Sequence, residues 1–259
     1  ATLIPQKLVE GGMERSQAVS QFGVVCGMTM PMLSLPIVFL GALNLVLVPR
    51  LARASALGRE GEVRRLVGRA MSAVSLLTLP AMSLMVVVGP DLGRVMFRQE
   101  GVGEHLIPLA LVMAMSCFCS VLASALNGVG SQRAVAAISL LGGVVQLLFT
   151  LALVPLPGVG MKGYVAGAVA STALELVLCL YWVRRRTGVR LELFRWMTAP
   201  ALASLLSALV GNLLFRLLKD GGLSPACAGV ATLAFALVLY LAALQAQGVE
   251  LRAFLRHRG

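Results

Sequence analysis

One acidic residue, Glu175, interrupts an otherwise apolar stretch of the sequence between Leu174 and Leu176. An ionisable side chain at membrane depth is costly, and it usually marks a transport pathway or a buried polar pair. Two interpretations are open. In the first, Glu175 faces a central cavity and serves as a polar contact or as a proton or cation site. In the second, it is protonated or hydrogen-bonded to a neighbour and takes no part in transport.

Three amides and two prolines are further candidates. Gln21, Asn44 and Gln146 lie within apolar stretches, where an amide can contact a substrate or join two helices by hydrogen bonds. Pro31 and Pro36 follow each other closely in the first long apolar stretch, and each removes a backbone hydrogen bond from a helix. Such broken helices line transporter cavities and can bend during alternating access, so the two prolines are hinge candidates.

The remaining reactive side chains do not form a catalytic or metal-binding pattern. The two histidines, His105 and His257, have no carboxylate or cysteine at ligand spacing, and no motif of a hydrolase, nucleotide-binding or zinc protein occurs. The five cysteines all lie in apolar stretches and are interpreted as reduced packing residues. The sequence therefore argues against an enzyme and predicts neither a metal nor a cofactor.

The composition is that of a protein in lipid. Of the 259 residues, 58% are hydrophobic and only 13% are charged, and the mean hydropathy is +0.89. The net charge of +11 comes from arginines scattered between apolar stretches and not gathered with aromatic residues, which argues against nucleic-acid binding. Membrane lipids with anionic headgroups are the expected partners of these arginines.

The elements that must position these residues are predicted to be transmembrane helices. Spanning a bilayer takes roughly 20 apolar residues, and no alternation typical of a β-barrel is visible. Helix ends are predicted at proline and glycine signals, namely Pro49, Gly89-Pro90, the segment 127–130, the segment 155–158 and Gly221-Gly222. The seven predicted spans are 16–49, 70–90, 105–132, 134–161, 163–183, 196–215 and 221–249. The fold class is therefore all-α, a polytopic helix bundle.

Lysines and arginines are unevenly shared between alternate loops, fifteen against seven. The richer loops are predicted to be cytoplasmic, which places the C-terminus inside and residue 1 on the outer side. The basic segment 50–69 is either an interfacial amphipathic helix or a solvated loop. Gly163, Gly167 and Ser171 recur at four-residue spacing, which predicts close contact with a neighbouring helix.

The order of several glycine and proline signals resembles a known family. Ile4-Pro5-Gln6-Lys7-Leu8 precedes the stretch that carries Pro31 and Pro36, and Pro49-Arg50-Leu51-Ala52 follows that stretch. Asn127-Gly128-Val129-Gly130 and Gly158-Val159-Gly160-Met161-Lys162-Gly163 come later in the same order. Together they resemble stage V sporulation protein B and its polysaccharide-exporter relatives in the multidrug/oligosaccharidyl-lipid/polysaccharide superfamily.

The resemblance implies an architecture. Such proteins have fourteen helices in two lobes around a central cavity, with a final helix pair. Residues 1–195 would form the second-lobe bundle, from the end of the seventh helix to the twelfth, and residues 196–259 the final pair and a cytoplasmic tail. The chain begins at Ala1 without an initiating methionine, so we expect a C-terminal half whose partner is the missing N-terminal lobe of the same protein.

The resemblance also implies a function. The relatives move a lipid-linked oligosaccharide or peptidoglycan precursor across the bacterial plasma membrane by alternating access, in one branch for spore cortex synthesis. Arg15 is the nearest candidate for a pyrophosphate contact in this lobe, although it falls in a predicted outer loop that faces headgroups. Two alternatives remain open: a cation-coupled multidrug exporter that uses Glu175, and a membrane scaffold that recruits glycan synthases through Arg184, Arg185 and Arg186.

Overall fold

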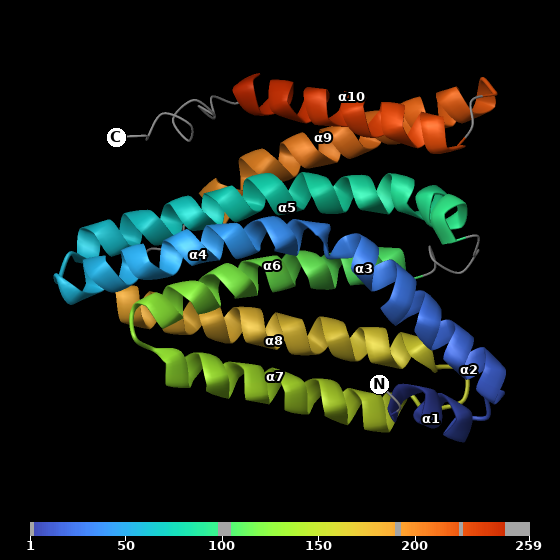
Figure 1. Ribbon diagram of the computed structural model, residues 1–259, viewed down its shortest axis with the longest axis horizontal. Coiled ribbons are helices and arrows are strands. Elements are labelled where there is room, and N and C mark those ends of the chain that lie inside the picture. The colour runs from blue at the N-terminus through green and yellow to red at the C-terminus, as the bar shows by residue number, and fades with distance from the viewer. Residues whose placement is uncertain (1–2, 98–104, 190–192, 223–224, 247–259) are drawn as a thin grey trace.

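The computed structural model describes residues 3–97, 105–189, 193–222 and 225–246 (Figure 1). All regular elements in these ranges are helices, as the all-α prediction requires. In chain order they are α1 (Leu3–Glu10), α2 (Arg15–Phe22), the π-helix η1 (Gly23–Thr29), α3 (Met30–Leu33), α4 (Leu35–Ala56), α5 (Glu60–Phe97), α6 (Leu106–Gly128), α7 (Gln132–Leu153), α8 (Met161–Thr187), α9 (Leu193–Asp220) and α10 (Pro225–Ala246).

The chain is a multi-pass membrane protein. Within the described residues, α4, α5, α6, α7, α8 and α9 each hold an apolar stretch long enough to cross a bilayer. The seventh predicted span corresponds to α10, in which the apolar stretch Cys227–Ala243 is shorter. Many leucines on the outer surface are exposed, for example Leu140 on α7 and Leu209 on α9. A surface of this kind is stable only when lipid or another membrane segment covers it.

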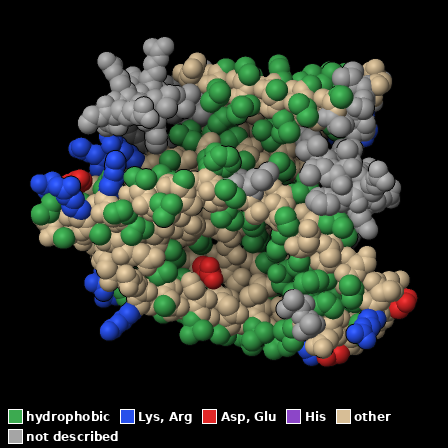
Figure 2. All heavy atoms as spheres, in the orientation of Figure 1, with side chains coloured by type: hydrophobic (Ala, Val, Ile, Leu, Met, Phe, Trp, Pro, Cys, Tyr) green, Lys and Arg blue, Asp and Glu red, His purple; other side chains and the backbone are tan. Residues whose placement is uncertain are grey.

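The long helices run back and forth along one direction (Figure 1). The turns from α4 to α5 and from α6 to α7 lie at one end, and the turn from α7 to α8 lies at the other end beside α1 and α2. Lysine and arginine side chains gather at these two ends, with apolar side chains between them (Figure 2). This distribution places the two ends at the two membrane surfaces.

The bundle has two apolar cores and one attached helix pair. One core joins α4, α5, α6 and α8 around Leu51, Met71 and Leu122, and the other joins α1, η1, α3, α6 and α8 around Leu8, Leu33 and Leu109. The pair α9 and α10 packs on α5. The hydroxyl of Tyr240 on α10 donates a hydrogen bond to the carbonyl of Leu76 on α5 at 3.0 Å, which ties this pair to the bundle.

The first predicted span is divided into α2, η1, α3 and α4. Ser34 separates α3 from α4, and Figure 1 shows that α4 continues in a different direction from α2 and α3. Pro31 and Pro36 each lie in the first two residues of a helix, α3 and α4 respectively. Proline is favoured in the first turn of α4, where its missing N–H would have no partner in the helix anyway. Pro31 instead lies where η1 passes directly into α3, and it removes a backbone donor from a continuous helical stretch. The two prolines therefore flank the interruption at Ser34.

Two of the predicted helix ends are wrong. Pro49 lies inside α4, and α5 passes through Gly89-Pro90 to end at Phe97. A single proline removes one backbone bond, which a membrane helix tolerates. The ends predicted at 127–130, 155–158 and 221–222 are confirmed, since α6, α7 and α9 end within two residues of these signals.

The segment 50–69 is neither a separate interfacial helix nor a loop. Its first part continues α4 to Ala56, and its last part belongs to α5, which begins at Glu60. Gly58, with a φ of 66°, lies in the short turn between the two helices. The basic residues therefore extend two membrane helices beyond their apolar parts.

Candidate functional site

The polar candidates Gln146 and Glu175 lie in one seam between α7 and α8. The two helices are antiparallel, so residues that come later in α7 lie opposite residues that come earlier in α8. Gly163 of α8 faces Leu153, and Gly167 faces Phe149: a Cβ atom on these glycines would approach the Cβ atoms of those residues to 2.9 and 2.6 Å. The close helix contact predicted from the small residues is therefore confirmed.

The side chain of Gln146 forms two hydrogen bonds with α8. Its Nε2 donates a hydrogen bond to the carbonyl of Tyr164 at 3.3 Å, and its Oε1 accepts one from Ser171 Oγ at 3.1 Å. The carbonyl of Gln146 also accepts a bond from Thr150 at 2.8 Å. The two bonds of the Gln146 side chain join α7 to α8 at membrane depth, so the structure favours the helix-joining interpretation of this amide.

Glu175 lies one turn further along the same seam, against Gly142 of α7. A Cβ atom on Gly142 would overlap the carboxyl group of Glu175, so the glycine is what gives that group its space. Within the described residues, Glu175 makes neither a hydrogen bond nor an ion pair, and its side chain is half-buried. The hydrogen-bonded alternative for Glu175 is therefore not seen in this arrangement.

One face of the bundle is hollowed between α4 and α7. Figure 2 shows this hollow in the middle of the face, with one acidic side chain inside it, far from the charged ends. Both α4 and α7 pack on α6, and α7 also packs on α8, so that α6 and α8 lie behind the hollow. A polar group within a hollowed apolar face is an arrangement suited to contact with a substrate or a coupling ion.

Asn44 points into the bundle between α4 and α6. Its Nδ2 donates a hydrogen bond to Ser120 Oγ at 2.9 Å, whereas its Oδ1 is buried and has no partner among the described residues. A buried acceptor without a donor is costly. Asn44 therefore joins two helices and leaves one buried acceptor without a hydrogen bond among the described residues.

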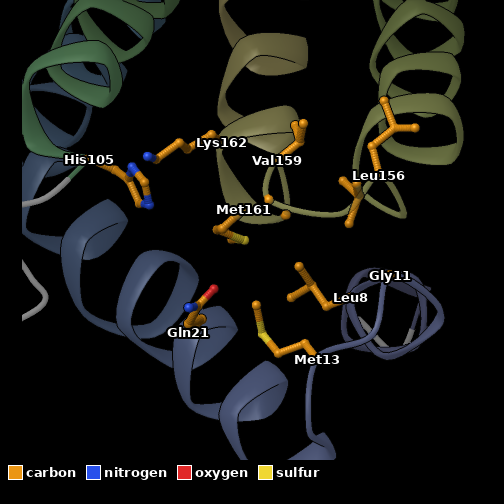
Figure 3. Close-up of a pocket in the computed structure, with 12 residues that line it drawn as sticks. Leu8, Gly11, Met13, Gln21, His105, Leu156, Val159, Met161 and Lys162 are labelled. Carbon is orange, nitrogen blue, oxygen red and sulfur yellow. The ribbon is translucent and has the colours of Figure 1, made fainter.

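Gln21 and Arg15 lie apart from the seam, on α2. Gln21 lines a small pocket at the end of the bundle with Met13, Met161 and Lys162, and its amide points into that pocket (Figure 3). Arg15 begins α2 and is exposed to the surroundings. The structure thus places the candidates in separate locations: Gln146 and Glu175 together, with Asn44, Gln21 and Arg15 each apart from them.

Sequence reasoning missed two contributors to the seam. Gly142 supplies the space for Glu175, and the carbonyl of Tyr164 accepts a bond from Gln146. Gly142 and Gly143 are adjacent glycines in an apolar stretch, a signal that indicates close approach, whereas a backbone carbonyl leaves no trace in the sequence. In the described part of the chain, no group of three or more histidine, cysteine or acidic residues could hold a metal ion.

No family model matches the chain, and comparisons with curated proteins and with solved structures also find no match.

Proposed function

We propose that the chain is one lobe of a membrane transporter that moves a lipid-linked oligosaccharide or peptidoglycan precursor across the bacterial plasma membrane by alternating access. The observation that carries the proposal is the hollow between α4 and α7, with a polar seam beside it. Carrier cavities are built in this way, from helices that expose a few polar groups at membrane depth within otherwise apolar walls.

Exposed apolar side chains on α4 and α7 are available for contact with a partner in the membrane. Val38 on α4 keeps 72% of its surface exposed, and Leu140 on α7 keeps 70%. A first lobe packed on the same face would convert the hollow into an enclosed cavity. The interruption at Ser34 gives α4 a point about which one end of that cavity could open and the other close.

The attached pair α9 and α10 favours a lipid-linked substrate. It lies on α5, on the side of the bundle away from α7 and α8 (Figure 1). Additional membrane helices attached to the bundle provide apolar surface along which a long lipid tail could rest outside the hollow while the glycan enters it. In the family that the sequence resembles, a final helix pair has this relation to the tail.

The test is to express the gene that encodes this chain in bacteria depleted of their own lipid II flippase. We expect growth to be restored and lipid-linked precursor to become accessible to a membrane-impermeant label at the outer face. A gene with Gly167→Leu, which prevents α7 and α8 from packing, is the negative control. If the unaltered protein inserts normally into the membrane but the precursor remains unlabelled, this substrate is rejected.

A second candidate function, a cation-coupled exporter, is favoured by the carboxyl group of Glu175, which has no partner among the described residues. If Glu175 binds the coupling ion, Glu175→Gln should abolish transport that depends on an ion gradient, and Glu175→Asp should retain part of it. Gln146→Glu, which adds a carboxylate one turn away in the same seam, should restore activity to the Glu175→Gln protein only partly. Full transport by Glu175→Gln would exclude coupling through this residue.

A further inference from the structure

Five arginines surround one hollow at the end of the α4–α5 hairpin. They lie on α4, in the turn and on α5, and the hollow contains a single acidic residue, Glu62. The five are Arg50, Arg53, Arg59, Arg65 and Arg69. Such a concentration of like charge within one surface depression creates a positive potential that attracts anions.

Among the residues that the structure describes, four of these arginines have no acidic partner to neutralise them. Arg59 Nη1 lies 3.5 Å from Glu62 Oε2 and forms a surface ion pair. Within the described residues, the guanidinium groups of Arg50, Arg53, Arg65 and Arg69 make no ion pair or hydrogen bond. Guanidinium groups bind phosphate oxygens in pairs of parallel hydrogen bonds, so a phosphate is the anion that this set matches best.

The guanidinium group of the neighbouring Arg64 on α5, in contrast, is bound by other groups of the protein. Arg64 bonds Glu60 Oε2 at 3.0 Å and the carbonyl of Thr187 at 3.2 Å, and it thereby connects α5 to the end of α8. Arg65, the next residue, points instead into the hollow. Of these two adjacent arginines, Arg64 therefore makes a structural contact and Arg65 lines the hollow.

An apolar groove continues from the arginine hollow along the same two helices. Arg50, Leu66 and Arg69 line both the hollow and the groove, and the groove goes on between α4 and α5 toward the middle of the bundle. The rest of its wall is apolar: Leu43, Val46, Leu47, Ala70 and Ala73. The two small alanines leave room on the α5 side, and no charged group follows Arg50 and Arg69 inward.

We propose that the arginine hollow and the apolar groove together bind one anionic glycerophospholipid, with its phosphate between Arg50 and Arg69 and one acyl chain in the groove. Only a ligand with both parts uses both surfaces. A free phosphate or an acidic peptide would leave the groove empty, and a neutral lipid would leave the arginines unbalanced. The proposal is independent of the transported substrate, because the site lies on the α4–α5 hairpin and not in the α7–α8 seam.

The experiment measures phosphatidylglycerol retained by the purified full chain in neutral detergent, by native mass spectrometry at graded lipid concentrations. For Arg50→Gln/Arg69→Gln we expect about a thirtyfold higher half-saturating concentration, because two phosphate contacts are lost. The matched control, Arg133→Gln/Arg184→Gln, removes the same charge from other exposed helix ends and should behave as the unaltered protein. Equal weakening in both double variants would overturn the proposal.

Three further measurements separate the two parts of the site. Ala73→Phe fills the groove without changing charge, and it should reduce retention of phosphatidylglycerol while leaving thermal stability unchanged. Phosphatidylcholine should be retained less than phosphatidylglycerol. Glycerol phosphate at the same concentration as the lipid should not displace it. Normal retention by Ala73→Phe, equal retention of the two lipids, or displacement by glycerol phosphate would each reject a phospholipid as the occupant.

Discussion

The α7–α8 pair and the segment from α2 to α4 differ in how they accommodate polar groups inside the membrane. The pair consists of two uninterrupted helices that meet through glycines and are joined by the Gln146 side chain. The segment changes from α-helix to π-helix, then to a four-residue helix, and is interrupted at Ser34. Both regions pack against other helices, but only the second needs additional local hydrogen bonds to compensate for its irregular backbone.

The interrupted segment satisfies its irregular backbone with nearby groups. Thr29 Oγ1 donates to the carbonyl of Val24 at 3.0 Å within η1, and Ser34 Oγ donates to the carbonyl of Pro31 at 2.7 Å. The N–H of Ile37 bonds the carbonyl of Ser34 at 3.0 Å, a three-residue step in place of the usual four. Unsatisfied carbonyls are costly in lipid, so these bonds let the interruption exist without making it rigid.

The largest effect should follow from Gly167→Leu. The new side chain would begin 2.6 Å from Phe149 Cβ and force α7 away from α8. Overpacking of this kind costs about 1–3 kcal/mol, and we expect the upper end because backbone must move. Thermal unfolding in detergent measures the loss. Gly143→Leu is the control, since a Cβ there meets no atom within 4 Å, and an equal loss in both variants would show that the seam is not tightly packed.

A smaller loss is expected for Gln146→Ala, which removes two bonds between α7 and α8. Interhelical hydrogen bonds in membranes contribute on average about 0.6 kcal/mol, so the variant should lose about 1 kcal/mol. Asn44→Ala removes one bond and also a buried acceptor that had no donor, and should lose less. Thermal unfolding compares the stability losses of the two variants. A larger loss for Asn44→Ala would mean that the α4 amide contributes more to stability than the α7 amide.

The smallest effect on stability should come from Pro36→Ala, which allows α3 and α4 to join. We expect the free energy of unfolding to change by less than about 1 kcal/mol, while transport of precursor falls because the segment bends less readily. Pro49→Ala, in the uninterrupted part of α4, should leave transport unchanged. Unaltered transport by the Pro36→Ala protein in the flippase-depleted cells would reject the hinge.

Glycine spacing predicted the seam well, because close approach of two helices leaves a direct trace in residue size. Gly163, Gly167 and Ser171 identified the contact face of α8, although not its partner helix. Glu175 was visible as a lone carboxyl group in an apolar stretch, but its position against Gly142 depends on how α7 packs. The sequence thus indicated which side chains are unusual, and only the fold showed which of them meet.

Helix ends were predicted less well where apolar stretches stop. A run without charges marks the part of a helix that lies in hydrocarbon, whereas α4 and α5 continue through arginines into the interface. For the same reason, the segment 50–69 was interpreted as a separate element. The arginine hollow could not be predicted either, since its wall combines residues from both sides of a turn.

The length of α5 has a mechanical consequence. Its 38 residues extend about 57 Å, nearly twice the roughly 30 Å of hydrocarbon, so it must tilt or project from the membrane. The same helix contacts α4 and α6 on one side and carries α9 and α10 on the other. Because α5 connects the α4–α5 hairpin to the helix pair, any movement of the hairpin would reach α9 and α10 through this single helix.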